Sequence, residues 1–556
     1  MAITSPSTPT FSASFYSSPA EGTLITCFPA AALSFSRRCQ ALIQHPTRRL
    51  TLSSRFNSSM PSDPGGSVSP DDGDVQNELH HMFSARGRRR GLPVFVTLPA
   101  DAVGPTAGQV RRRKAMAQSF RALSAAGIEG VVLEVWWGLV ERDQPGVYNW
   151  LGYWEIVAMA RQCGLKVRAI MAFHQCGTQP GDPQWIPLPQ WVLEEINKNP
   201  DLAYSDRFGR RNTEYISLGC DILPVLRGRS PVQAYTDFMR SFRNAFKPLL
   251  GNVITEIQVG MGPAGELRYP SCPSEKLMWA WRTRELGEFQ CYDKYMLASL
   301  NACAQEIGMR EWGNGGPISA SNLMQDPELT EFFKSENGSW NSPYGKFFLE
   351  WYSRMLIIHG ERICREAETI FRGIEVKTSA KLASIHWHYG TQSHPSELTA
   401  GYYNTYKRDG YLPIARMFGR YGFSLCCTCF EMQDEEEKQM NPVSSPEGLI
   451  RQLLLAAMVC DVPVEGENSA AYLDDRSFNQ VLKMSRSYSE GVERSCFTFN
   501  FVRMDKNLFE YQNWVRFTRF VKQMSAANIF RARLGSADFH ASITDSWRAG
   551  YALACS

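Results

Sequence analysis

The feature that most constrains the fold of this chain is a regular alternation of short apolar runs with longer segments of helical period, from Val94 onward. The short runs are rich in Val, Ile, Leu and Phe and have the length of buried strands. Most are followed by a segment long enough for a helix. This alternation is typical of parallel β/α units, in which each helix connects two parallel strands.

Eight such units in one domain predict an α/β fold with a (β/α)8 barrel. The alternating region is longer than the roughly 250 residues typical of this barrel, so we expect long insertions in the βα loops, above all after the third and fourth strands. The predicted helices include Gln109–Ala126, Pro231–Leu250, Pro446–Cys460 and Phe509–Met524. The predicted strands are Val94–Leu98, Gly130–Trp136, Val167–Phe173, Val253–Met261, Lys381–Trp387, Phe423–Thr428, Val462–Gly466 and Phe497–Arg503.

Composition excludes several classes of protein. A chain of 556 residues with 44% hydrophobic residues is too long and too apolar for a disordered protein. The 59 basic residues are nearly balanced by 56 acidic ones, which argues against nucleic acid or an anionic membrane as a partner. Among the 15 cysteines only Cys426 and Cys429 have C-x-x-C spacing, within an apolar run. We therefore expect reduced, buried thiols and no zinc site.

The first 90 residues differ from the rest. Residues 1–60 are rich in Ser and Thr, lack Lys and Asp, and have their arginines only from Arg37 onward. This distribution resembles a chloroplast transit peptide, with a merely disordered tail as the alternative. Residues 61–90 read as a polar linker, and its basic run Arg86 to Arg90 as a solvated entry segment in preference to a nucleic-acid tract. The barrel is expected at 91–525, and residues 526–556 form a C-terminal tail.

Residues with catalytic potential follow the predicted strands. In a (β/α)8 barrel the active site lies at the carboxyl ends of the strands, so side chains at these positions converge on one rim. A single His or Glu at a strand end is more often structural than functional. Seven strand ends that each carry polar or aromatic side chains together favour a functional site. The segments concerned are Glu134–Trp137, His174–Gly177, Gly262–Pro270, His386–Trp387, Thr428–Glu431, Gly466–Asn468 and Arg503.

Two carboxylates stand out at this rim. Glu266 follows the fourth predicted strand in a Gly/Pro-rich turn, and Glu467 ends the seventh. Two carboxylates that face each other among aromatic residues suit glycoside hydrolysis, where one protonates the leaving oxygen and the other activates water. The structural alternatives are a salt bridge from Glu266 to Arg268 and a cap of the following turn by Glu467.

Several long motifs resemble the plant β-amylases, which are exo-hydrolases that release maltose from α-1,4-glucans with inversion. The resemblance covers about residues 91 to 525. It rests on FHQCG (173–177), GPAGELRYPSCP (262–273), EFQCYDKYM (288–296), HPSELTAGYYN (394–404) and GEN (466–468).

The resemblance implies a role for each site residue. It makes Glu266 the general acid and Glu467 the general base, about 6.5–9.5 Å apart as in inverting hydrolases. It implies no cofactor and no catalytic metal. Asp182 looks like the carboxylate on a flexible lid, and Thr428 like the inner-loop threonine that steadies the acid. The positions that bind glucose units or orient the base are Glu134, His174, Lys381, His386, Asn468 and Arg503.

Four positions depart from the pattern of active family members. Glu134 replaces an aspartate that holds a sugar hydroxyl, Pro180 stiffens the lid, His388 replaces a tryptophan, and Ala470 replaces a leucine that inserts beside the glucan. With PSCPSEKLMWAWR (270–282) and FEMQDEEE (430–437), the chain looks most like a plastid branch of the family regarded as inactive.

We therefore expect a stromal chloroplast protein that binds starch and malto-oligosaccharides and regulates maltose production with little turnover. One alternative is an active β-amylase. The other is a non-catalytic scaffold that binds other plastid starch-degrading enzymes.

Overall fold

A closed barrel of eight parallel strands forms the centre of the fold. The computed structural model describes residues 91–177, 180–182, 184–271, 286–318, 326–489 and 497–526. The predicted transit peptide and linker, and the tail from residue 527, lie outside the described residues. The strands follow the order β1-β10-β9-β8-β7-β6-β3-β2, and β1 pairs with both β2 and β10. This confirms the predicted (β/α)8 architecture. The barrel strands are β1 (Val94–Thr97), β2 (Gly130–Trp136), β3 (Lys166–Ala172), β6 (Ile254–Val259), β7 (Lys377–Leu382), β8 (Phe423–Cys427), β9 (Val464–Glu467) and β10 (Thr498–Phe501).

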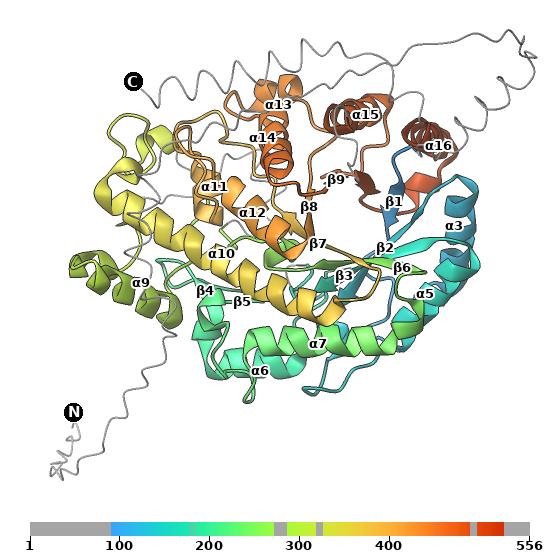
Figure 1. Ribbon diagram of the computed structural model, residues 1–556, viewed down its shortest axis with the longest axis horizontal. Coiled ribbons are helices and arrows are strands. Elements are labelled where there is room, and N and C mark those ends of the chain that lie inside the picture. The colour runs from blue at the N-terminus through green and yellow to red at the C-terminus, as the bar shows by residue number, and fades with distance from the viewer. Residues whose placement is uncertain are drawn as a thin grey trace, which may run out of the picture. The chain divides into compact units, whose positions relative to one another are not determined.

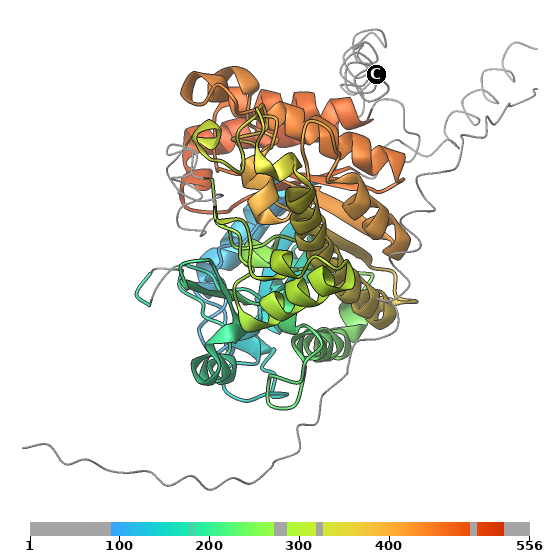
Figure 2. The same cartoon turned by 90° about the vertical axis from the view of Figure 1, so that its left-hand side faces the viewer.

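Helices surround the strands (Figure 1), and a view turned by 90° shows the early helices and the late helices on opposite sides of them (Figure 2). Ser445 caps the start of α14, because its side chain accepts a hydrogen bond from the Gly448 amide and Pro446 follows it in the first turn. The helices are α3 (Arg113–Ala125), α4 (Trp137–Val140), α5 (Leu151–Gln162), α6 (Gln190–Lys198), α7 (Pro231–Ala245), α9 (Lys294–Glu306), α10 (Pro343–Phe371), α11 (Pro395–Ala400), α12 (Leu412–Tyr421), α13 (Asp434–Met440), α14 (Pro446–Val459), α15 (Asp475–Ser489) and α16 (Tyr511–Ser525).

Two long insertions interrupt the β/α alternation, as predicted. The first lies between β3 and β6 and contains a small antiparallel sheet of β4 (Ala203–Ser205) and β5 (Arg211–Ile216), which the sequence did not predict. The second, between β6 and β7, contains α9 and the 29-residue helix α10. No helix in the described part of the chain is long and apolar enough to cross a membrane.

The fifth predicted strand was placed too late in the chain. It was expected at Lys381–Trp387, but β7 spans Lys377–Leu382 and the following residues to Trp387 are not in a strand. The strand itself is polar, KTSAKL, whereas Ala383–Trp387 are buried beside it and, apart from Ser384, apolar or aromatic. Hydrophobicity therefore favoured the wrong segment, because one face of β7 lines a polar barrel interior.

That interior differs from the shell outside the strands. Outward-facing residues such as Val131 and Leu133 belong to the large apolar cluster under the helices. On the opposite face, Phe95, Val132 and Ile170 form a separate small apolar cluster inside the barrel. The rest of the interior carries many polar side chains.

A buried ion-pair cluster forms part of this interior. Arg168 on β3 is 1% exposed, donates to Glu256 of β6 over 2.7 Å and also pairs with Glu465 of β9. The Ser379 hydroxyl on β7 donates to Glu256 over 2.6 Å. One guanidinium therefore connects strands from different sides of the barrel, and its loss leaves two buried carboxylates without their cation.

We predict that Arg168→Ala lowers the free energy of unfolding by about 3–5 kcal/mol, because removal of one partner strands the buried charges of the others. Denaturant unfolding measures this change. The matched control is Arg420→Ala, since Arg420 is 65% exposed in its 3.0 Å pair with Glu361 and a surface pair contributes little. Equal losses in the two variants would contradict a structural role for the Arg168 cluster.

Candidate active site

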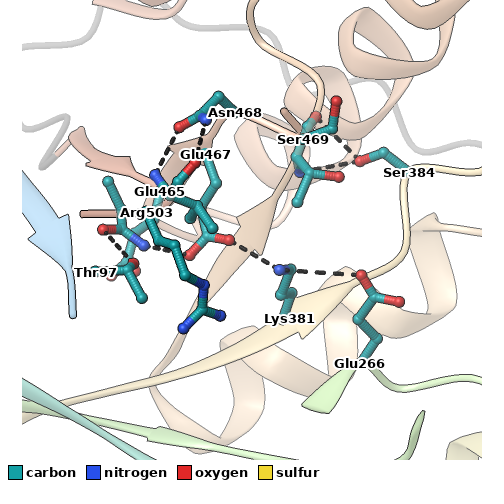
Figure 3. A network of polar contacts seen from close by, with 12 residues as sticks. Thr97, Glu266, Lys381, Ser384, Glu465, Glu467, Asn468, Ser469 and Arg503 are labelled. Carbon is teal, nitrogen blue, oxygen red and sulfur yellow. Dashed lines mark hydrogen bonds and ion pairs between the residues drawn. The ribbon is translucent and has the colours of Figure 1, made fainter. Parts of the chain in front are cut away.

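Lys381 links the two predicted catalytic carboxylates. Its ammonium lies 2.8 Å from Glu467 Oε2 and 4.0 Å from Glu266 Oε1 (Figure 3). These two facing oxygens are therefore at most about 6.8 Å apart, and the carboxyl groups as a whole lie close enough to act on one glycosidic bond. The structure thus brings Glu266 and Glu467 together at the carboxyl ends of β6 and β9, as the sequence predicted.

Glu467 is the more buried of the two carboxylates, with its side chain 3% exposed. Asn500 on β10 donates to Glu467 Oε1 over 2.8 Å, and Thr97 of β1 in turn donates to the Asn500 carbonyl over 3.0 Å. Burial alone would raise the pKa of Glu467, but Lys381 and Asn500 outweigh it and hold the pKa below its usual value. Glu467 is therefore ionised and able to accept a proton from water.

Lys381 remains charged for the reciprocal reason. Burial opposes its charge, but Glu467 and Glu266 raise the pKa of Lys381 above its usual value. The ammonium of Lys381 therefore lies between the two carboxyl groups and forms its shorter contact with Glu467.

Glu266 is presented by a tight turn after β6. A Cβ at Gly262 would lie 2.4 Å from the Glu266 carbonyl oxygen, so only glycine allows the chain to pass there. Gly265 has φ of +74° and sits against the His174 ring. The turn then pairs with β7, because the Leu267 amide donates to the Lys381 carbonyl over 2.9 Å. Local geometry thus places Glu266 beside Lys381.

The salt bridge considered as a structural alternative for Glu266 is also present. Arg268 Nε donates to Glu266 Oε2 over 2.8 Å, and Arg268 is 2% exposed. The Oε1 atom of Glu266 is the one that faces Lys381. The salt bridge and the site coexist, since each uses a different carboxylate oxygen.

Glu134 and Arg503 form a second ion pair at the same rim. Arg503 donates from its two terminal nitrogens to both oxygens of Glu134, over 2.8 and 3.0 Å, and also to the Leu98 carbonyl over 2.9 Å. Burial disfavours the charge of Arg503, but Glu134 raises its pKa. This bidentate geometry is the strong form of a guanidinium–carboxylate contact.

His174 and Asn468 also lie at this rim. The His174 ring packs edge-on to Trp136, with the ring centroids 5.1 Å apart. Burial lowers the pKa of His174 to about 4, so the ring is neutral near pH 7. Asn468 donates to the carbonyls of Ala470 and Val502 and accepts from the Val502 amide. It therefore connects the end of β9 to the residue before Arg503.

Three predicted site residues have contacts that lead elsewhere. The Thr428 amide donates to the Ser384 hydroxyl over 3.0 Å, and the Thr428 hydroxyl lies 3.6 Å from Cys429 Sγ. His386 Nδ1 lies 2.9 Å from the Ser444 hydroxyl, and burial lowers the pKa of His386 to about 4. The Asp182 carbonyl accepts from the Trp185 amide in the predicted lid, where residues 178, 179 and 183 lie outside the described residues.

Sequence reasoning missed Asn500 as a hydrogen-bond partner of Glu467. A signal was present, because Asn500 is a polar residue in the apolar run FTFNFV (497–502) and stands in register with Glu467. An inward-facing polar residue on a barrel strand beside the base was a recognisable candidate.

The arrangement suits acid–base chemistry. It offers an ionised carboxylate, a second carboxylate with its own cation, and neutral imidazole and amide groups for hydrogen bonds to a polar substrate. Among the described residues, no group of three or more His, Cys, Asp or Glu side chains could hold a metal ion.

We predict that Lys381→Met destabilises the protein most near neutral pH. Glu467 has a lowered pKa in the folded state, so it contributes stability above the unfolded pKa that is lost as pH falls through the folded one. Without the ammonium this contribution disappears, and the difference between wild type and variant shrinks in acid. Denaturant unfolding from about pH 3 to 7 measures it.

The control for this prediction is Lys438→Met, because Lys438 is 50% exposed and pairs with Asp434 at the surface. Its effect on stability should be small at every pH. A loss in Lys381→Met that does not change with pH would show that Lys381 does not hold Glu467 in its ionised form.

Comparison with known proteins agrees with this geometry. Residues 95–528 match the model of glycosyl hydrolase family 14. The chain is 55% identical over 439 residues to "Beta-amylase 1, chloroplastic" of Arabidopsis thaliana, covering 78% of this chain and 76% of that one. It is 51% identical over 455 residues to "Beta-amylase 1, chloroplastic" of Oryza sativa subsp. japonica, covering 82% and 84%. The solved catalytic domain of β-amylase from Paenibacillus polymyxa has the same fold, with a TM-score of 0.64, 24% identity, and 78% and 98% of the two chains covered. This chain belongs to glycosyl hydrolase family 14, the β-amylase family.

Proposed function

We propose that this protein binds α-1,4-glucan in the chloroplast stroma and regulates maltose production beside other starch-degrading enzymes, with weak or no maltose release of its own. The observation that carries this proposal is the bidentate pair of Glu134 and Arg503. The chloroplast location is supported by relatives that are named chloroplastic. The likeness to the plastid paralogue called inactive β-amylase 4 points the same way.

Glu134 and Arg503 occupy positions that, by the resemblance to the family, bind glucose units or orient the base. Here the two side chains bind each other. Both oxygens of Glu134 accept from Arg503, and the Glu134 side chain is only 15% exposed. A glucose hydroxyl that approaches Glu134 has to share or displace a guanidinium contact. The glutamate stem is one methylene longer than that of the aspartate it replaces, which moves the carboxylate along its stem. An error of about 1 Å in the position of a substrate costs on the order of 100-fold in rate.

Ala470 adds to this loss. It replaces a larger apolar side chain and lies in the turn after the base, so it offers less surface to a bound glucan. Binding is expected to persist, because Lys381, Asn468 and His174 keep their positions at the rim. Weak turnover with retained binding is the combination that we propose.

A second candidate function, full β-amylase activity, is favoured by one observation. Lys381 lies between Glu266 and Glu467, and Glu467 is ionised, as the inverting mechanism requires of its base. In that mechanism Glu266 donates its proton to the leaving oxygen while Glu467 removes a proton from the attacking water. The two candidates differ in rate and not in the roles of these residues.

We predict that the purified mature protein binds maltotriose by isothermal titration and releases little maltose from soluble starch. Glu266→Gln and Glu467→Gln should each abolish the remaining release in a protein that still folds. The melting temperature should fall in both variants, since each removes a charge that pairs with a buried cation. Rapid maltose release by the wild type would favour the second candidate. Absence of maltotriose binding would contradict the proposal.

We predict that Glu134→Asp combined with Ala470→Leu raises maltose release by at least about 100-fold, or roughly 2.7 kcal/mol of transition-state stabilisation. The shorter carboxylate frees Arg503 from the bidentate contact, and leucine restores the apolar wedge. The effect should lie in turnover, with a smaller change in maltotriose affinity. A double variant that folds, binds maltotriose and remains as slow as the parent would move attention to the lid with Pro180.

A further inference from the structure

The turn that follows the general base is held from a neighbouring loop. It comprises residues 468–470 after β9. The loop after β8, residues 428–432, approaches it closely: the Phe430 amide donates to the Glu467 carbonyl over 3.2 Å. The Phe430 ring also lies where a Cβ of Gly466 would meet it at 3.0 Å. The loop after β8 thus packs directly against the end of β9.

Glu431 makes the main polar contact between the two segments. Its Oε1 atom accepts three hydrogen bonds, from the Ser469 amide over 2.9 Å, the Ser469 hydroxyl over 2.7 Å and the Ala470 amide over 2.9 Å. Glu431 is 4% exposed, so water competes little for these donors. One buried oxygen therefore satisfies two successive backbone amides of the turn.

The second oxygen of Glu431 is in a different situation. Its Oε2 atom is buried and has no hydrogen-bond partner within the described residues. Burial raises the pKa of Glu431, although the contacts from Ser469 and Ala470 oppose this. The hydrogen bonds from the turn to Glu431 therefore all end on Oε1. A neutral acceptor at that position can replace the carboxylate.

The other side of the turn is fixed as well. The Asn468 amide donates to the carbonyls of Ala470 and Val502, and its oxygen accepts from the Val502 amide over 2.8 Å. Residues 468–470 are therefore held by β10 on one side and by Glu431 on the other. Glu467 precedes this turn directly, so the place of its carboxylate depends on both.

We infer that Glu431 is a positioning residue, which fixes the turn 468–470 and through it the general base and the glucan contact at residue 470. The inference deepens the proposed function and rests on it for the glucan. Glu431 acts through the backbone and needs no contact with substrate. Its geometry requires only an acceptor at the place of Oε1.

This inference is tested with three variants. Glu431→Ala removes the acceptor, and Glu431→Gln keeps a carbonyl oxygen for the three donors and places the amide nitrogen at the orphaned Oε2. Glu437→Ala is the matched control, because Glu437 lines the same surface pocket of 400 Å³ and its carboxylate has no hydrogen bond to the turn in the described structure. Hydrogen exchange of the Ser469 and Ala470 amides, maltotriose affinity and melting temperature are measured for each.

We expect Glu431→Ala to speed exchange of the two amides and to weaken maltotriose binding, each by at least about tenfold, because a broken buried hydrogen bond costs about 1–3 kcal/mol. Glu431→Gln should keep both values near wild type. If the turn required the buried charge of Glu431, this variant would instead behave like Glu431→Ala. Glu437→Ala should behave as wild type. If Glu431→Ala does not fold, the Gln variant still decides, since loss of protection or of binding in it overturns the inference.

Unchanged exchange and affinity in a folded Glu431→Ala protein would overturn the inference and leave the proposed function intact. If wild type fails to bind maltotriose, the proposed function fails, and so does the glucan part of this inference. The exchange rates then still show whether Glu431 holds the turn.

Discussion

The ammonium of Lys381 is the charge on which the site depends. Two carboxylates near the end of a barrel would repel each other, and burial would drive at least one to take up a proton. Lys381 lies 2.8 Å from Glu467 and 4.0 Å from Glu266, and it favours the charged form of Glu467. Because it is on β7, between the strands that carry the two acids, the barrel closure itself sets this geometry.

The same principle runs through the barrel interior. Arg168 neutralises Glu256 and Glu465 one layer below, and Arg503 neutralises Glu134 at the rim. Each of these three acids thus has a cation from a distant part of the chain, which offsets the cost of burying its charge. The apolar energy of the fold comes instead from the large cluster between strands and helices. Stability and chemistry are carried by opposite faces of the same strands.

In the proposed function, this division allows glucan binding to persist while the rate of hydrolysis falls. Glu266, Glu467 and Lys381 form one connected group, and Glu134 with Arg503 forms another. A change in the second group leaves the first intact, so a protein of this family can keep its carboxylates and still handle sugar differently. The turn 468–470 joins the two groups, because Asn468 contacts the residue before Arg503 and Glu431 fixes the other end.

The sequence by itself determined the barrel and most of the rim. Alternating apolar runs predicted the strands because outward faces must be apolar to pack against helices, and motifs around Glu266 and Glu467 indicated the chemistry. It misplaced β7, whose inward face is polar, and it did not show Asn500 or Glu431 as partners of the base segment. Only the tertiary structure decided these points, together with the Glu134–Arg503 pair. Each is a contact between strands or loops distant in the chain, and spacing along a sequence carries no information about which side chains meet across a closed barrel.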